Sequence, residues 1–309
     1  MVEARLRVPD ELAVRVPEEE MRGTVVDVFV ALGLPADEAE QAADVLLWAD
    51  LRGVESHGVS NMMPYYVQGL RQGVINPQPE PTAVRETAAI ATVDSDRGLG
   101  LAVGPRFMRM AIDKARATGI GAVAVTNGRH FGAAGYHAWL ALEHDMIGLA
   151  MTVGGLSVAP TFGARAMVGL NPLAVAAPAA TEPPFVFDAS MSSVAGNKIR
   201  LAQRLGVDVA GGWIALPDGT PVMDEGPVPD AFHMLPLGAT RDIGSHKGFS
   251  LAMMVDILSG LLSGTGPGFN NVGTASHHFL AYNISAFVDP DQFKQEMDVY
   301  LRGLRETPT

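Results

Sequence analysis

The sequence contains no cysteine, and this absence removes several kinds of chemistry at once. Without thiols the chain has no disulfide scaffold, no cysteine-ligated zinc or iron–sulfur cluster, and no thiol nucleophile. Any acid–base or covalent step must therefore use other side chains. A cysteine-free chain also suits a reducing compartment, so we expect a cytoplasmic protein.

Positive charge is the second shortage. The 309 residues include 22 lysines and arginines against 34 aspartates and glutamates, which gives a formal net charge of −12. Such a chain repels the phosphates of nucleic acids and anionic membrane surfaces, so we expect neither as a partner. Residues 1–20 have neither signal-peptide nor transit-peptide order. Residues 146–164 carry no charge, but glycines and a proline interrupt them, which predicts a buried strand and loop rather than a membrane span.

The common catalytic and phosphate-binding motifs are missing too: there is no Walker loop, no GxSxG elbow and no HExxH. Residues 119–124 (GIGAVA) match the spacing of a dinucleotide fingerprint, but they follow a helix and open a strand, the reverse of what that mechanism requires. A nucleotide would need a different fold. His130, His137 and His144 recur every seven residues, yet that step spans about 10 Å, so we expect no metal site.

Apolar periodicity divides the first two thirds of the chain at a proline-rich stretch near residues 76–82. Before it, residues 1–82 show helical spacing interrupted by loops. After it, residues 83–245 alternate between extended and helical patterns, which predicts an α/β region.

Residues 246–309 form a third segment. Within it, residues 247–264 have apolar side chains on nearly every helical face, which predicts a helix inside a core. Residues 284–290 (ISAFVDP) alternate as a strand does, and an amphipathic helix follows them.

Two histidines and two charged residues stand where chemistry is plausible. His57 lies in a loop between two predicted helices, and His130 lies in a glycine-flanked loop after a predicted strand, where α/β proteins bind ligands. Asp188 ends an apolar strand and could orient an imidazole, contact a ribose hydroxyl or cap a helix. Lys247 opposes a helix dipole, which favours either an anionic ligand nearby or a solvated lysine.

Together these residues belong to segments that resemble the malate/L-lactate dehydrogenase family of the non-Rossmann type. The resemblance covers about residues 20–295, and its seven motifs follow the order of the family: DLRGVESHGV, GRHFGAAG, GLNPLAVAAP, FVFDASMSSVAGNKI, DGTPVMDE, LPLG and SHKGFSLAMMVDILSGLLSG. The family includes ureidoglycolate dehydrogenase, diketogulonate reductase, sulfolactate dehydrogenase and piperideine-2-carboxylate reductases. The resemblance implies an α/β fold in which residues 83–245 form a central cofactor-binding domain. The N-terminal helical segment 1–82 is then expected to pack with the C-terminal helices and strand of residues 246–309, and the protein to be a homodimer.

The resemblance also implies an activity: hydride transfer between NAD or NADP and a small 2-oxo or 2-hydroxy acid. By motif position, His57, His130 and Asp188 are the catalytic residues. We expect His57 to exchange the proton of the substrate oxygen and Asp188 to stabilise the imidazolium; His130 would bind that oxygen or exchange roles with His57.

The resemblance also implies the cofactor site by motif position. The site is expected to use small and polar residues from three loops: Gly154, Asn171, Asp188, Ala189, Ser190, Ser192, His246 and Lys247. Relatives use either NAD or NADP, and the sequence leaves open whether Lys198 and Arg200 reach a 2′-phosphate. NAD is slightly preferred.

This sequence departs from the family pattern in two places. Asn61 stands four residues after the SHG histidine, where relatives place an arginine for the substrate carboxylate, so Arg129 or Arg52 is expected to replace it. The sequence also ends at Thr309, before the Pro-Gly-Glu segment that relatives fold over the cofactor. Two alternatives stay open: a reductase of cyclic imino acids, and an inactive homologue that binds ligands without turnover.

Overall fold

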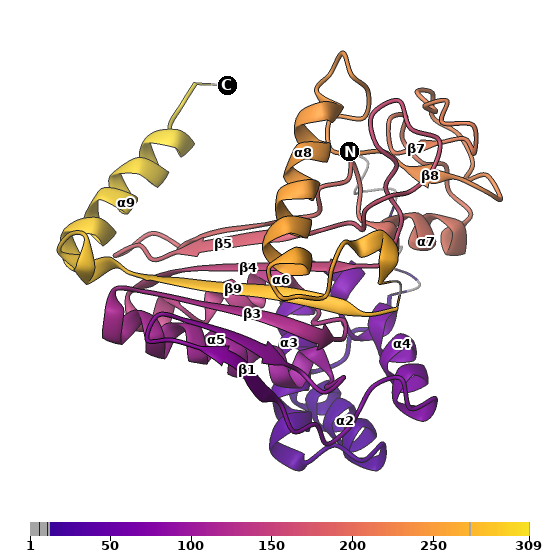
Figure 1. The fold of residues 1–309 in the computed structure, drawn as a ribbon. Helices are drawn as coiled ribbons and strands as arrows, with labels where there is room; N and C mark the ends of the chain where they lie inside the picture. The colour runs from indigo at the N-terminus through magenta and orange to yellow at the C-terminus, as the bar shows by residue number, and fades with distance from the viewer. Residues whose placement is uncertain (1–5, 7–10, 12, 272, 309) are drawn as a thin grey trace.

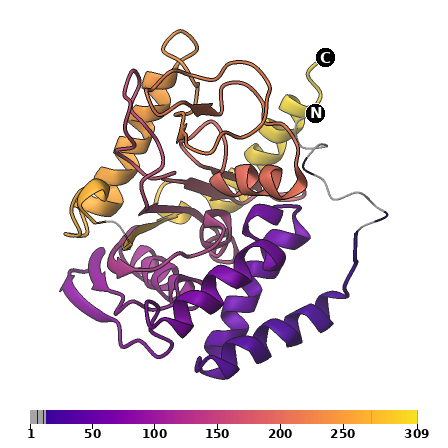
Figure 2. The same cartoon turned by 90° about the vertical axis from the view of Figure 1, so that its right-hand side faces the viewer.

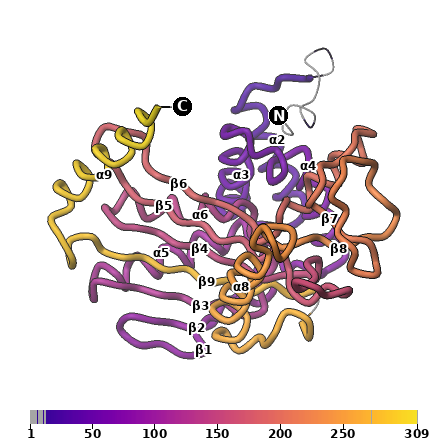
Figure 3. The backbone as a smooth tube through the Cα atoms, turned by 90° about the horizontal axis from the view of Figure 1, so that it is seen from above, coloured from indigo at the N-terminus to yellow at the C-terminus, as the bar shows by residue number. Residues whose placement is uncertain are grey.

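A mixed sheet of seven strands runs through the computed structural model, which describes residues 6, 11, 13–271 and 273–308. The strand order across the sheet is β1-β2-β3-β9-β4-β5-β6, and only β2 and β3 are parallel neighbours (Figure 3). The strands are β1 (Thr82–Glu86), β2 (Ile90–Asp94), β3 (Ile120–Gly128), β4 (Met146–Gly154), β5 (Leu173–Ala177), β6 (Phe185–Ala189) and β9 (Ala275–Asn283), with β7 (Ile214–Ala215) and β8 (His233–Met234) in a separate pair.

Helices lie on both faces of the sheet (Figure 1). On one face α5 and α6 share a core with the strands, and α2, α3 and α4 pack beyond them (Figure 2). On the other face lie α8, its π-helical continuation η3 and the β7–β8 pair. The helices are α2 (Glu18–Ala31), α3 (Ala36–Leu51), α4 (Val59–Arg71), α5 (Gly100–Thr118), α6 (Ala134–Trp139), α7 (Gly196–Leu205), α8 (Ser245–Val255), η3 (Asp256–Leu261) and α9 (Pro290–Arg305), with short turns η1 (Glu55–His57), η2 (Leu142–His144), η4 (Gly268–Asn270) and η5 (Ile284–Ala286).

Two glycines bring the helices close to the sheet. A Cβ atom on Gly121 of β3 would lie 1.9 Å from a backbone oxygen of α5, and one on Gly148 of β4 would lie 2.2 Å from a backbone oxygen of α6. Real side chains never approach so closely, so only glycine permits this packing.

The strand predicted at residues 284–290 is wrong. The structure has a 3-10 turn at Ile284–Ala286, and the strand is instead β9 (Ala275–Asn283), which lies between β3 and β4. Most of β9 is buried on both faces, so its sequence lacks the alternation that marks a half-exposed strand. The segment 246–309 therefore supplies a central strand to the sheet whose other strands lie between residues 82 and 189.

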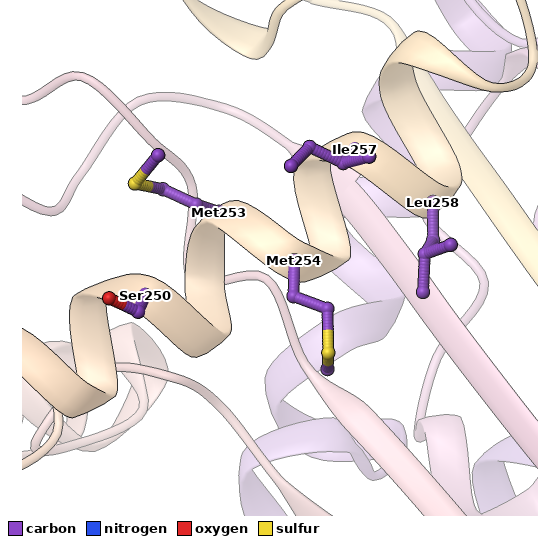
Figure 4. A pocket seen from close by; sticks show the side chains of 5 residues that line it. All are labelled: Ser250, Met253, Met254, Ile257 and Leu258. Carbon is purple, nitrogen blue, oxygen red and sulfur yellow. The ribbon is translucent and has the colours of Figure 1, made fainter.

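The prediction that residues 247–264 form a core helix is also wrong for the single chain. Ala252 and Val255 are buried, but the opposite side of α8 and η3 lies at the surface. There Met253, Met254 and Ile257 are 46%, 37% and 50% exposed, and they line a shallow pocket with their neighbours (Figure 4). Within the part of the chain that the structure describes, no helix is long and apolar enough to cross a membrane.

Candidate active site

The structure brings His57 and His130 together from distant parts of the chain. His57 ends the turn η1 between α3 and α4, and His130 lies in the turn that follows β3. Their rings stack with centroids 5.8 Å apart and planes inclined by 13°. Both side chains are half-buried, so a small molecule can reach them while most water is excluded.

The hydrogen bonds of His130 fix its tautomer. Nδ1 accepts a hydrogen bond from the backbone N–H of Gly132 at 3.2 Å and lies 2.7 Å from the Tyr66 hydroxyl. A backbone N–H can only donate, so Nδ1 is unprotonated and Nε2 of the neutral ring carries the hydrogen. The pKa of His130 is lowered to about 3, mainly by burial of the ring and to a smaller extent by the nearby positive charges of other histidines and Arg200. His130 therefore presents a neutral Nε2–H group near pH 7.

His57 is held by the polypeptide around it. Its Nδ1 lies 3.0 Å from the Ser56 hydroxyl, and burial lowers the pKa of His57 to about 4. The Ser56 carbonyl accepts hydrogen bonds from the Asn61 amide at 2.9 Å and from the Asn197 amide at 2.7 Å. Asn61 thus stabilises the turn that carries His57.

Asp188 lies at the end of β6 and contacts the first turn of α6. Its Oδ2 accepts a hydrogen bond from the Gly135 N–H at 2.6 Å, which is a helix-capping contact. The residue is exposed at the surface, yet desolvation of its carboxylate raises the pKa to about 6, and the Gly135 bond opposes that rise. Among the hydrogen bonds of the described residues, none joins Asp188 to His57 or His130.

The two arginines expected to bind substrate are both engaged with protein groups. The guanidinium of Arg52 lies over the rings of Trp48 and Trp139, 4.3 and 4.8 Å from their centroids. Arg129 donates hydrogen bonds to two backbone carbonyls, at 2.9 and 2.7 Å. Neither arginine forms a hydrogen bond with the histidine pair within the described parts of the chain.

Two groups at the site, Tyr66 and Asn197, were missed by the sequence reasoning, and a third, Arg200, was considered there only for a 2′-phosphate. Tyr66 is fully buried and follows the helical spacing of core residues in α4, so its hydroxyl contact with His130 had no signal in the sequence. Asn197 and Arg200 lie in the first turns of α7, and Arg200 Nη1 is 3.4 Å from Asn197 Oδ1. Their connection to Ser56 arises only when α7 packs beside η1.

The expected cofactor residues fall in three places. Gly154 ends β4, and Asn171 lies beside it because Gly169 between them has no side chain: a Cβ there would be 2.4 Å from the Gly154 oxygen. Asn171 has a φ of 45°, and its side-chain amide donates a hydrogen bond to the Ala252 oxygen at 2.8 Å. Its buried Oδ1 accepts no hydrogen bond from the described residues.

The second and third places follow β6 and begin α8. Ala189 ends β6, and Ser192 beyond it donates to the Val194 oxygen at 2.6 Å and lies 3.0 Å from the Ser190 hydroxyl. At the start of α8, Lys247 is exposed and His246 Nδ1 lies 3.0 Å from Arg241. No group of three or more described histidine, aspartate and glutamate side chains is arranged to hold a metal ion.

The comparisons with known proteins agree with this architecture. A family model described as malate/L-lactate dehydrogenase matches residues 16–309. Malate dehydrogenase of Pyrococcus abyssi is 40% identical over 306 residues, covering 96% of this chain and 84% of that protein. L-sulfolactate dehydrogenase of Methanocaldococcus jannaschii is 34% identical over 299 residues, covering 94% and 84%.

Solved structures are similar as well. Malate dehydrogenase from Pyrococcus horikoshii superposes with a TM-score of 0.89 and 36% identity, covering 98% of this chain and 85% of that one. A delta1-piperideine-2-carboxylate reductase from Pseudomonas syringae gives a TM-score of 0.83 and 25% identity, covering 96% and 90%. The chain belongs to the malate/L-lactate dehydrogenase family, which confirms the resemblance and the α/β fold, and it is a hydroxy acid dehydrogenase.

Proposed function

We propose that this enzyme interconverts a small 2-oxo acid and the corresponding 2-hydroxy acid with NAD, using His57 and His130 at the substrate oxygen. The observation that carries the proposal is the stacked, half-buried pair of neutral imidazoles. Hydride transfer to a carbonyl carbon must be accompanied by a proton at the oxygen, and imidazoles suit that task.

The two rings take different tasks, because Nε2 of neutral His130 carries a hydrogen that can only be donated in a hydrogen bond. During oxidation of the hydroxy acid, neutral His57 accepts the hydroxyl proton and releases it to solvent; during reduction His57 first takes up a proton from solvent and then donates it to the substrate oxygen. The Nε2–H of His130 donates a hydrogen bond to the same oxygen as negative charge develops there. Positioned proton transfer typically contributes about 10²–10⁴-fold in rate. Asp188 acts indirectly: its carboxylate accepts a hydrogen bond from the first turn of α6 and so holds the segment that follows the His130 loop.

The residues present fit a nicotinamide dinucleotide, which would supply or accept the hydride. Lys247 and Arg241 place positive charge at the N-terminus of α8, where a helix dipole favours phosphate. Gly154 lies at the carboxyl end of β4, where α/β proteins bind ligands, and Asn171 beside it keeps a buried Oδ1 without a hydrogen-bond partner among the described residues. Asp188, Ala189, Ser190, Ser192 and His246 complete the proposed cofactor contacts. NAD remains the slight preference over NADP.

We propose that Arg200 supplies the cation that Asn61 lacks. Its charge contributes to the lowered pKa of His130, so its guanidinium lies within electrostatic range of that ring. A carboxylate next to the reacting carbon would lie between the two groups, as a 2-oxo acid requires. Asn61 contributes by holding the His57 turn, whereas Arg52 and Arg129 are engaged with tryptophan rings and backbone carbonyls.

The proposal includes a homodimer in the cytoplasm, the compartment that a cysteine-free composition suits. In a chain with net charge −12, the exposed face of α8 and η3 is apolar, so a second copy can approach there without repulsion. The replacement Ile257→Lys should convert dimers to monomers in size-exclusion chromatography with light scattering. A monomeric wild type would overturn this part of the proposal.

The decisive experiment measures oxidation of NADH and NADPH with a panel of 2-oxo acids and cyclic imines, for wild type, His57→Ala and His130→Ala. We expect turnover of a 2-oxo acid that falls by about 10²-fold or more in both variants. The exposed His144→Ala is the matched control and should keep full activity.

A second candidate is the reduction of a cyclic imino acid, which the similarity to the piperideine-carboxylate reductase favours. Turnover of imines alone would establish it in place of the proposed reaction. Cofactor binding without turnover of any compound would instead indicate an inactive homologue that binds ligands.

A further inference from the structure

Two buried histidines outside the His57–His130 pair contact the turn that carries His130. His137 lies on α6 and is 0% exposed, and His277 lies on β9 and is 1% exposed. Their rings stack on the two sides of Phe131, with centroid distances of 4.5 and 4.7 Å and interplanar angles of 24° and 6°. The residue after His130 is thus enclosed between two imidazoles from different elements.

Each of these imidazoles binds the backbone carbonyl of a residue adjacent to His130. His277 Nε2 lies 3.1 Å from the Arg129 oxygen, and His137 Nε2 lies 2.8 Å from the Phe131 oxygen. A carbonyl can only accept, so both Nε2 atoms carry hydrogen and donate. The other nitrogen of His277 lies 2.8 Å from the Thr152 hydroxyl, which ties that ring to β4 as well.

The sequence leaves room for both rings. A Cβ on Gly128 would lie 2.6 Å from His277 Nε2, and a Cβ on Gly104 of α5 would lie 2.7 Å from His137 Cε1. Any larger residue at either position would displace an imidazole from its carbonyl. In the register of the sheet, His277 of β9 pairs with Val125 of β3 on one side and with Thr152 of β4 on the other, near the end of β3.

We propose that His137 and His277 are positioning residues that hold the carbonyls before and after His130 and so fix the direction of its Nε2–H. This inference rests on the proposed function, in which that group binds the substrate oxygen. Fixing the Arg129 carbonyl holds the peptide plane that precedes His130 and restricts its φ, while fixing the Phe131 carbonyl restrains the residue that follows it. Tyr66 then restrains the His130 ring through Nδ1. A misplacement of about 1 Å at a reacting group can cost about 10²-fold in rate.

The test compares His277→Asn with His277→Gln. The glutamine amide nitrogen sits at about the distance of the imidazole Nε2 from the backbone and can donate to the Arg129 oxygen. The asparagine amide nitrogen corresponds to Nδ1 and cannot reach that carbonyl. We expect kcat to fall by about 10²-fold in His277→Asn, with KM for the cofactor unchanged, and to be restored for the most part in His277→Gln.

Matched controls separate positioning from general loss of structure. His278 is the next residue on β9, faces the other side of the sheet near Leu258, and is also buried. His278→Phe should leave kcat unchanged. His137→Asn and His137→Gln repeat the comparison at the second carbonyl, and the thermal midpoint of each variant is recorded. Equal losses in the Asn and Gln variants of both histidines, with midpoints like that of wild type, would overturn the proposal.

A second readout does not depend on turnover. In protein labelled with ¹⁵N-histidine, wild-type His130 should show an unprotonated Nδ1 and a protonated Nε2, and His277→Asn should shift these signals toward a mixture of tautomers. A wild type that shows this signature but turns over no 2-oxo acid would refute the proposed function and not the positioning contacts. Unchanged His130 signals in His277→Asn would refute the positioning role.

Discussion

Acidification should destabilise this protein through its buried neutral histidines. Burial lowers the pKa of His277 to about 3 and that of His137 to about 4, from an ordinary value of 6.5. Between the folded-state and ordinary pKa values, the histidines of the unfolded chain bind protons that those of the folded chain do not. The free energy of unfolding is therefore highest above pH 6.5 and falls as the pH decreases below that value. At pH 5 each of these imidazoles is expected to cost about 2 kcal/mol of the free energy of unfolding.

The assay is urea unfolding at pH 7.5 and pH 5, followed by circular dichroism, for wild type and His277→Gln. Glutamine does not titrate, so the loss between the two pH values should be about 2 kcal/mol smaller in the variant. The exposed His144→Gln is the matched control and should lose as much as wild type. An equal loss in wild type and His277→Gln would show that the buried ring is protonated in the folded state and would refute the reasoning.

Three further predictions concern other contacts. Gly121→Ala should lower the free energy of unfolding by more than about 2 kcal/mol, because its Cβ would lie 1.9 Å from a backbone oxygen of α5. Gly23→Ala, on the open side of α2, should instead raise the free energy of unfolding by about 0.5–1 kcal/mol, and urea titration measures both changes. Arg200→Ala should raise KM for the 2-oxo acid about tenfold or more with little change in cofactor KM, and the exposed Arg204→Ala should change neither in steady-state kinetics. Tyr66→Phe should lower kcat, since His130 Nδ1 loses its hydroxyl partner; a kcat equal to that of wild type would contradict this role.

Local patterns in the sequence were informative where the chemistry is local. Glycine and proline marked the ends of helices, the missing fingerprint excluded a Rossmann loop, and the flexible surroundings of His57 and His130 indicated a ligand site. Motif order identified the family, and the comparisons confirmed it. These features depend on neighbouring residues, so the sequence alone determined them.

The burial of β9 and the exposure of α8 were not predictable in this way. A strand buried on both faces and a helix apolar on all faces give no alternation that states which side meets water. The strand was therefore placed too far along the chain, and the helix was assigned to a core. Only the packing of other elements decides which side of such an element is covered.

The arrangement of the site was decided by tertiary structure for the same reason. The sequence determined which imidazoles, carboxylates and cations are available and on which turns they lie. The fold decided that His57 stacks on His130, that Asp188 caps α6, and that Arg129 binds backbone carbonyls. It also placed His277, from the last strand, behind the turn after β3. Such contacts join residues far apart in the chain, and their geometry exists only once the sheet and its helices have packed.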